Sequence, residues 1–221
     1  MKNLLFIGSN SELARDLKVY LNQKDYGLNI TGISRAKKSL YVDYCIKNYL
    51  SNNFTNLLRK ILSGKNIDAV FIFNGSSDEN LSKDELINTN LIVPSNIVDI
   101  CDTFSLQNRR HIKVVFVSSV ASQFIKNSNY TYGLSKYFVE NYLIRKSSSN
   151  SYLSYLIFRL GPFESKLTKN FKQNSAIVSI RLISIGIYKK MFKIDSVYSI
   201  PSIWFLINIM LNFFPFLKKR L

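Results

Sequence analysis

The sequence predicts an α/β fold: a doubly wound parallel sheet with helices on both faces, followed by a hydrophobic helical extension at the C-terminus. Short apolar segments alternate with amphipathic segments of helical periodicity from the first residues onward. Val114–Val117 contains no polar residue, which is typical of a strand buried on both faces. The 221 residues, 47% of them hydrophobic, suffice for one domain with a full core.

The expected elements follow one another in a repeated strand–helix order. Strands are expected at Leu4–Ile7, Ile30–Ile33, Leu40–Val42, Ala69–Phe73, Val114–Val117 and Tyr155–Phe158. Helices are expected at Ser11–Leu21, Asn53–Leu62, Lys83–Cys101 and Tyr132–Ile144. A ligand of such a sheet binds beyond the carboxyl ends of the strands, so residues that directly follow strands are expected to converge on one site. Gly8, Asn74, Ser118 and Ser119 stand at such positions.

The first strand leads into the first helix through a turn with a single glycine. Its residues are Gly8, Ser9, Asn10, Ser11, Glu12, Leu13 and Ala14. A glycine turn before a helix offers backbone N–H groups and the positive end of the helix dipole to a pyrophosphate. The same residues also fit an ordinary helix start with a serine N-cap, so both interpretations stay open.

Basic residues follow the second strand. Arg35 comes directly after Ser34, Lys37 and Lys38 are nearby, and no acidic residue stands where it would accept hydrogen bonds from a ribose 2′-hydroxyl. Arginine at this place suits the 2′-phosphate of NADP. The pattern therefore favours NADP(H) over NAD(H), the alternative being a solvated basic turn.

A tyrosine and a lysine lie one turn apart in the last expected helix. Tyr132 and Lys136 are four residues apart (136 − 132) and so share a helix face. An ammonium close to a phenol favours the phenolate, so we expect the Tyr132 pKa to fall below its ordinary ~10. Ser119 lies 13 residues before the tyrosine (132 − 119). The tyrosine–lysine pair alone is better explained as a surface lysine beside a half-buried tyrosine. Together with Ser119, the three side chains are expected to move a proton.

The order of these motifs resembles the short-chain dehydrogenase/reductase family over residues 1–165. The most specific part is Ser119 with Tyr132-x-x-x-Lys136, while Gly8 alone matches the family's Gly-x-x-x-Gly-x-Gly turn, in which Glu12 and Ala14 replace the other glycines. The remaining resemblances are Asn74 and Gly75 near the cofactor, Asp43 at the adenine, Asn90 in the catalytic set, and Gly161 and Pro162 after Arg159, beside the nicotinamide.

The resemblance implies a Rossmann-fold NAD(P)-binding and catalytic core at residues 1–165, a substrate lid at 166–195 and a hydrophobic helix at 196–221. It implies hydride transfer between a nicotinamide and a carbonyl or alcohol carbon. In the reducing direction Tyr132 would donate a proton, Ser119 would hold the developing alkoxide, and Lys136 would lower the tyrosine pKa and bind the ribose hydroxyls. Asn90 would hold a water that returns the proton through the lysine.

The amino-acid composition indicates which classes of binding partner to expect. Lys and Arg outnumber Asp and Glu by 30 to 14, a net charge of +16, which favours anionic partners such as phosphorylated substrates or acidic lipid headgroups. The sequence has no motif of basic and aromatic residues typical of a nucleic-acid-binding protein, so nucleic acid is not expected as a partner. One histidine and two cysteines leave little for a metal site or a disulfide framework. The N-terminal residues lack a signal-peptide pattern, which predicts a cytoplasmic protein.

The C-terminal third departs from the usual family ending. No charged residue occurs from Ser196 to Leu217, and Lys218, Lys219 and Arg220 follow. A transmembrane span is a poor fit because prolines and asparagines interrupt the segment. A buried helix that packs on the sheet or on a second subunit, and a membrane-surface helix at the inner membrane face, both remain open. The predicted lid combines lysines with apolar residues, which suits a phosphorylated, lipid-linked substrate.

These observations predict an NADP(H)-dependent short-chain oxidoreductase that reduces a keto-sugar or lipid-linked sugar in bacterial surface polysaccharide biosynthesis. The C-terminal pattern resembles the branch that includes decaprenylphosphoryl keto-pentose reductase. The alternatives are an NDP-sugar epimerase or dehydratase, for which the chain is short, and a non-catalytic, nucleotide-sensing scaffold with the same fold. A homo-oligomer is expected from the resemblance alone.

Overall fold

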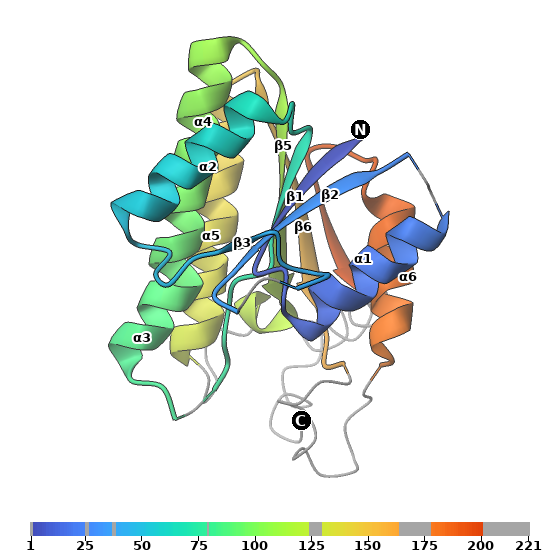
Figure 1. Cartoon of the computed structure of the whole chain (residues 1–221). Helices are drawn as coiled ribbons and strands as arrows, with labels where there is room; N and C mark the ends of the chain where they lie inside the picture. The colour runs from blue at the N-terminus through green and yellow to red at the C-terminus, as the bar shows by residue number, and fades with distance from the viewer. Residues whose placement is uncertain are drawn as a thin grey trace.

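A parallel sheet forms the centre of the molecule (Figure 1). The computed structural model describes residues 2–24, 27–36, 39–78, 80–123, 130–163 and 178–200. Its strands are β1 (Asn3–Ile7), β2 (Asn29–Ser34), β3 (Tyr44–Cys45), β4 (Ala69–Ile72), β5 (Ile112–Ser119), β6 (Leu153–Leu160) and β7 (Ser196–Ile200). They run in the order β3-β2-β1-β4-β5-β6-β7, and neighbours pair in parallel. The predicted doubly wound α/β fold is confirmed.

Helices cover both faces of this sheet (Figure 1). On one face lie α2 (Asn52–Gly64), α4 (Val93–Asn108) and α5 (Tyr130–Ser149); on the other lie α1 (Glu12–Lys24) and α6 (Ile180–Lys190). Each face has its own core, because successive side chains of a strand point to opposite sides. In β1, for example, Leu5 and Ile7 join the first core while Leu4 and Phe6 join the second. All four are fully buried, as expected of a strand covered on both faces.

The helix expected at Lys83–Cys101 is a helical stretch with a wide turn in it. It consists of α3 (Lys83–Ile87), one turn of π-helix, η1 (Asn88–Ile92), and then α4. Pro94 lies just after the wide turn and has no N–H, so it gives no helical hydrogen bond to the carbonyl of Asn90, four residues earlier. Wide turns of this kind often lie at functional sites, and Asn90 is fully buried in this one.

Two expectations about strands are wrong. The third strand is Tyr44–Cys45 rather than Leu40–Val42, since Val42 forms only a local antiparallel bridge with Ser39. The hydrophobic segment was expected to be helical from Ser196, but residues 196–200 form β7, which pairs with β6 at the sheet edge. The remainder of that segment, residues 201–221, lies outside the described residues, as do Lys37 and Lys38.

The predicted lid also differs from expectation in its second half. Helix α6 packs beside α1 on the sheet, and Ile183, Ile187 and Met191 are fully buried in the core. Their spacing of four residues places them on one helix face, which explains the packing. Residues 166–177 of the predicted lid lie outside the described part of the chain.

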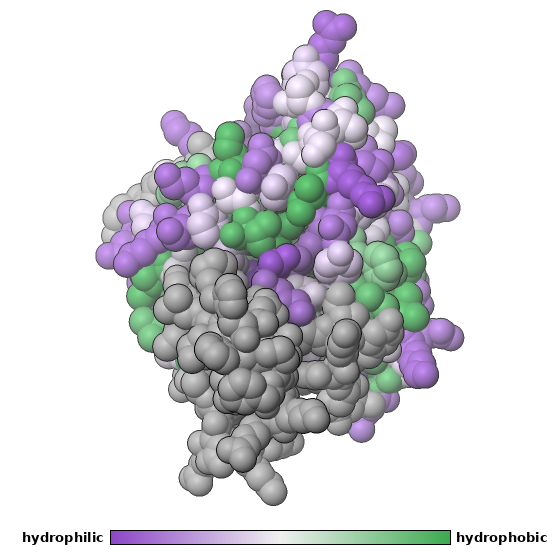
Figure 2. All heavy atoms as spheres, turned by 180° about the vertical axis from the view of Figure 1, so that it is seen from behind, coloured by the Kyte–Doolittle hydropathy of each residue, from purple (hydrophilic) through white to green (hydrophobic). Residues whose placement is uncertain are grey.

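The surface is mixed in polarity. Seen from behind, hydrophobic residues form small patches among hydrophilic ones (Figure 2). Exposed apolar side chains include Phe138 on α5 and Leu182 on α6, and Phe192 and Ile194 between α6 and β7. Of the helices described, none has the length and apolarity needed to cross a bilayer.

Candidate active site

The candidate catalytic side chains meet at the carboxyl ends of the central strands. Ser119 is the last residue of β5, and Tyr132 and Lys136 lie in the first turns of α5. The hydroxyl of Ser119 lies close enough to the phenol of Tyr132 to lower the pKa of that phenol as a hydrogen-bond partner. The neighbouring Ser118 points elsewhere, because its hydroxyl donates to Glu140 at 2.5 Å. The structure thus brings together the serine, the tyrosine and the lysine that the spacing singled out.

The Tyr132 phenol has a pKa above its ordinary value, so the expected lowering is wrong. Burial raises the pKa because it disfavours the phenolate, and the hydrogen bond with Ser119 opposes this only in part. The Lys136 ammonium lies over the phenol ring, 5.8 Å from its centroid, and does not dominate the titration of the hydroxyl. In this arrangement the tyrosine is held protonated, which is the form that can donate a proton.

Lys136 is an almost fully buried ammonium, with 3% of its surface exposed. Its Nζ donates to the carbonyl oxygens of Asn74, at 3.1 Å, and Val117, at 3.3 Å. Burial lowers the pKa of Lys136 to about 8, and the carboxylate of Glu140 opposes that effect. The lysine is therefore charged at neutral pH but titrates far below an ordinary lysine.

The loop after β4 packs closely on this lysine. A Cβ at Gly75 would lie 2.5 Å from Lys136 Nζ and 3.0 Å from Asn90 Oδ1, so only glycine fits here. Asn90 braces the same loop, because its Oδ1 accepts from the N–H of Ser76 at 3.0 Å and its Nδ2 donates to the Ser76 carbonyl at 2.8 Å. Asn90, Gly75 and Lys136 thus form one packed unit.

The turn after β1 passes close to the end of β4. Gly8 has a positive φ of 82°, and a Cβ there would lie 3.2 Å from the backbone of Phe73. Ser11 begins α1, with its Oγ accepting from the N–H of Ala14 at 3.3 Å. Of the other predicted contacts, Ser9 and Leu13 are buried, Asn10 is exposed and Glu12 is partly buried. Leu13 and Ala14 pack in the core, so their backbone alone can face a ligand.

Tyr49 lies near the end of β2 and was not identified from the sequence. Arg35 is exposed directly after β2. Its charge acts on the buried phenol of Tyr49, whose hydroxyl lies 3.5 Å from the Ile33 carbonyl and interacts with the side chain of Asn74. Burial raises the pKa of Tyr49. No motif marks this tyrosine, which reaches the site only because the loop after β3 folds back.

Asp43 lies apart from the other predicted residues. Its Oδ2 accepts from the N–H of Gly32 at 2.6 Å, in the middle of β2. It lines a pocket of about 510 Å³ together with Asn29 and Asn3, which begin β2 and β1 at the amino ends of the strands. Asp43 lies just before β3 rather than after the third strand, and its carboxylate fastens the loop to β2; its contact with adenine stays a prediction.

Gly161 and Pro162 follow β6 at the expected place. The N–H of Gly161 donates to the Ile200 carbonyl at 3.0 Å, and the Pro162 carbonyl accepts from Val178 N–H at 3.2 Å. The end of β7 therefore fixes the backbone of Gly161, and the segment before α6 fixes that of Pro162. Within the described residues, no group of three His, Cys, Asp or Glu is placed to hold a metal ion.

The comparisons with known proteins identify the fold. Neither the protein-family models nor the curated proteins contain a match to the chain. Solved structures do match. A short-chain dehydrogenase from Burkholderia cenocepacia in complex with NADP has a TM-score of 0.77 and 13% identity, covering 96% of this chain and 95% of its own.

Two longer proteins are also similar. UDP-glucose 4-epimerase from Thermotoga maritima, with UDP-glucose, has a TM-score of 0.68 and 13% identity over 90% of this chain and 76% of its own. The Bordetella bronchiseptica enzyme WbmH, in complex with NAD+, has a TM-score of 0.67 and 15% identity over 90% of this chain and 75% of its own. The chain therefore has the fold that these three proteins share.

Proposed function

We propose that this protein is an NADP(H)-dependent oxidoreductase that reduces the carbonyl of a keto-sugar or lipid-linked sugar in bacterial surface polysaccharide biosynthesis. The observation that carries the proposal is the placement of the Ser119 hydroxyl near the phenol of Tyr132, with the buried ammonium of Lys136 over the phenol ring. A protonated phenol, a second hydroxyl and a cation at the ligand-binding end of a doubly wound sheet suit proton donation to a carbonyl oxygen.

The residues at the carboxyl ends of the strands fit a nicotinamide dinucleotide. The backbone turn at Gly8 lets a pyrophosphate approach the N-terminus of α1. Asn74 is buried and its Oδ1 has no hydrogen-bond partner, which leaves an acceptor for a ligand. When bound, the nicotinamide supplies the hydride.

The side chains of the chain supply the proton and hold the reacting oxygen. Tyr132 donates its proton to the oxygen that develops negative charge, and Ser119 donates a hydrogen bond to the same oxygen. Lys136 offers its ammonium to ribose hydroxyls and to the phenolate that forms. Asn90 braces the loop against which that ammonium packs, and we assign it the water that returns the proton.

The preference for NADP(H) over NAD(H) rests on Arg35. Its exposed guanidinium follows β2 directly, at the place where a 2′-phosphate needs a bidentate donor. One similar solved structure holds NADP and another holds NAD+, so the arginine is the feature of this chain that favours one of them.

The partners follow from charge and from exposed surface. A net charge of +16 suits a phosphorylated or polyprenyl-linked sugar and the inner face of a membrane. A homo-oligomer through α4 and α5 is supported by exposed apolar side chains: Leu106 on α4 is 49% exposed, and Tyr137 and Phe138 on α5 are 39% and 51% exposed.

A second candidate is an NDP-sugar epimerase, since the likeness extends to UDP-glucose 4-epimerase. That protein has about a quarter of its length beyond the matched part, whereas the Burkholderia dehydrogenase is matched over 95% of its length. Because this chain matches nearly the whole dehydrogenase but only part of the epimerase, its length favours the reductase.

Titration of the protein with NADPH and NADH tests the cofactor assignment, and NADPH consumption with phosphorylated and polyprenyl-linked keto-sugars tests the reaction. We expect NADPH to bind at least about tenfold more tightly than NADH, and Arg35→Ala to abolish that difference. Arg59→Ala, an exposed arginine on α2, is the control and should change neither affinity. Absence of binding by both nucleotides would favour a non-catalytic scaffold.

A further inference from the structure

A buried carboxylate lies directly behind the candidate catalytic side chains. Glu140 follows Lys136 by one helical turn of α5, as Lys136 follows Tyr132, so the three residues form a column on one face. Its side chain is 1% exposed. A buried charge is tolerated only where partners neutralise it and satisfy its oxygens. Glu140 has such partners on three other elements.

Arg159 of β6 neutralises Glu140. Its Nε and Nη2 donate to Oε2 of the carboxylate at 3.0 and 2.6 Å. Arg159 stands opposite Ser118 in the register of β5 and β6, and Ser118 donates to the other carboxylate oxygen, Oε1, at 2.5 Å. The carboxylate therefore joins α5 to the carboxyl ends of both strands.

The third partner links the carboxylate to Ser119. Ser122 lies in η2 (Val120–Gln123), the 3-10 turn that follows Ser119. Its hydroxyl lies 2.9 Å from Glu140 Oε1 and 2.8 Å from the carbonyl oxygen of Ser119, within donating distance of both. The backbone of Ser119 is thus tied through Ser122 to the same helix that carries Tyr132.

We propose that Glu140 is the positioning residue of the site: through Arg159, Ser118 and Ser122 it fixes Ser119 against Tyr132, and it places a carboxylate one helical turn from Lys136 on the same helix face. The inference rests on the proposed function, since it concerns the same three side chains. Glu140 touches none of the reacting atoms and acts only through its neighbours.

The electrostatic part of the role follows from the groups around Lys136. Among the residues that the structure describes, the charged and titratable side chains that face this ammonium and its column are Tyr132 and Glu140 on α5 and Arg159 on β6. Arg159 is cationic and Tyr132 is neutral, so Glu140 supplies the negative charge. Its effect opposes the burial that lowers the pKa of Lys136 to about 8.

Glu140→Gln tests the charge, because glutamine keeps the shape of the side chain. Turnover should fall as pH rises through the Lys136 pKa, and in this variant we expect the midpoint of that loss to move down by about one pH unit. Lys146→Met is the matched control: it removes an ion pair of the same helix, between Lys146 and the α4 residues Asp99 and Asp102, and should leave the midpoint unchanged.

Ser122→Ala tests the anchor separately and serves if the glutamine variant does not fold. Hydrogen exchange of the amides of Val120–Gln123 should become about tenfold faster than in the wild type, since one hydrogen bond to a charged group is lost. Exchange in Lys146→Met should match the wild type there. Unchanged exchange in Ser122→Ala, or an equal change in the control, would overturn the anchoring role.

The two proposals fail in different ways. A wild-type protein that binds neither NADPH nor NADH refutes the proposed function, while the exchange measurement, which needs no cofactor, still decides whether Glu140 and Ser122 hold Ser119. A wild type that turns over NADPH, with a Glu140→Gln profile identical to its own, refutes the electrostatic role of Glu140 and leaves the reductase standing.

Discussion

At the scale of single residues, burial sets the chemistry of the site more than the contact between Tyr132 and Lys136 does. The sequence gives the one-turn spacing of the two side chains but not their exposure, which depends on the loop after β4 and on η2. Burial raises the pKa of the phenol and lowers that of the ammonium. The tyrosine is therefore a proton donor whose charge partner itself titrates near neutral pH.

The Lys136 pKa predicts opposite pH trends for function and stability. A lysine with a folded-state pKa of about 8, against 10.5 ordinarily, loses its charge as pH rises through 8, so NADPH affinity and turnover should fall there. Between these two values the unfolded chain holds more protons, so the contribution of this group to the unfolding free energy rises with pH. Lys136→Met should lose turnover yet unfold at a temperature no lower than the wild type, as measured by calorimetry at neutral pH. A lower unfolding temperature would contradict the assignment of Lys136 as a costly buried charge.

At the scale of elements, long apolar segments were predictable and short or edge segments were not. Strands β1, β2, β4, β5 and β6 have four or more residues each, with apolar residues in the middle, and each lies where the pattern placed it. Strand β3 has two residues, too few for any periodicity. Strand β7 is followed by an uncharged segment, so the hydropathy of the sequence does not separate this strand from the residues after it.

The site was predictable only where it follows spacing along the chain. Ser119, Tyr132 and Lys136 are separated by fixed local distances, and Asn90 and Gly75 follow from motif order. Glu140 and Arg159 are 19 residues apart and pair only because β6 lies beside β5 in the sheet. Tyr49 likewise reaches the site through tertiary folding.

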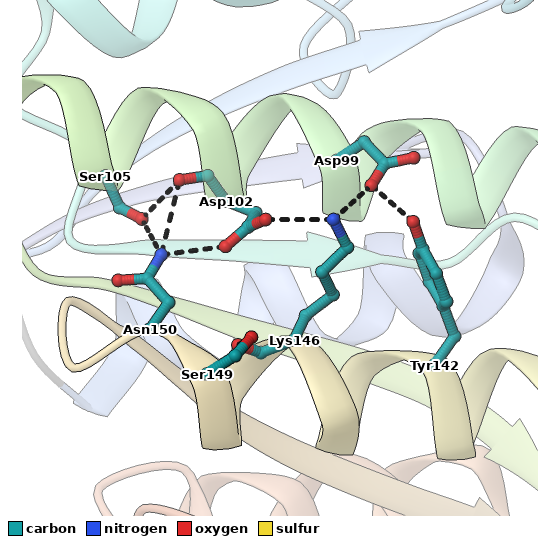
Figure 3. Close-up of polar contacts among 7 residues, drawn as sticks. All are labelled: Asp99, Asp102, Ser105, Tyr142, Lys146, Ser149 and Asn150. Carbon is teal, nitrogen blue, oxygen red and sulfur yellow. Dashed lines mark hydrogen bonds and ion pairs between the residues drawn. The ribbon is translucent and has the colours of Figure 1, made fainter.

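A polar clamp holds α4 and α5 together away from the site (Figure 3). Lys146 bridges Asp99 and Asp102, each at 3.0 Å, and the hydroxyl of Tyr142 donates to Asp99. Asn150, just after α5, donates from Nδ2 to Asp102 Oδ1 and to Ser105 Oγ, both at 2.8 Å. Hydrogen bonds and ion pairs raise the pKa of Lys146, so the clamp stays charged throughout the physiological range.

Asn150→Ala tests the clamp. The substitution leaves buried acceptors of Asp102 and Ser105 without a donor and should lower the unfolding free energy by about 2 kcal/mol in urea denaturation. The activity of the folded molecules should stay unchanged, because the clamp does not touch the site. Asn108→Ala is the matched control, as Asn108 is exposed and bonds only within α4; it should cost less than about 0.5 kcal/mol. Equal destabilisation by the two variants would contradict a specific clamp.

At the scale of the whole molecule, the structure redefines where a C-terminal truncation has to begin. Strand β7 pairs with β6 along five residues, so removal of residues 196–200 would expose the edge of β6. The segment whose membrane role is open therefore starts at Pro201. Its basic end, Lys218, Lys219 and Arg220, adds to the net charge of +16.

Liposome flotation of the full chain and of a chain ending at Ile200 tests the membrane interpretation. With vesicles rich in anionic lipid we expect the full chain to float and the truncated chain to remain in solution. Replacing residues 218–220 with glutamate, or raising the salt concentration, should reduce flotation. Each basic residue near an acidic membrane surface contributes about 1 kcal/mol to the binding free energy. If the full chain does not float, the segment serves protein packing instead.

The most direct test of the whole account is NADPH consumption by Tyr132→Phe beside Tyr142→Phe. Both variants remove one hydroxyl from α5, but only the first removes the proposed proton donor, since Tyr142 bonds to Asp99 in the clamp. We predict that Tyr132→Phe loses turnover by about 10²–10⁴-fold with NADPH affinity little changed, and that Tyr142→Phe retains wild-type turnover per folded molecule. Wild-type turnover in Tyr132→Phe would contradict the assignment of Tyr132 and the mechanism built on it.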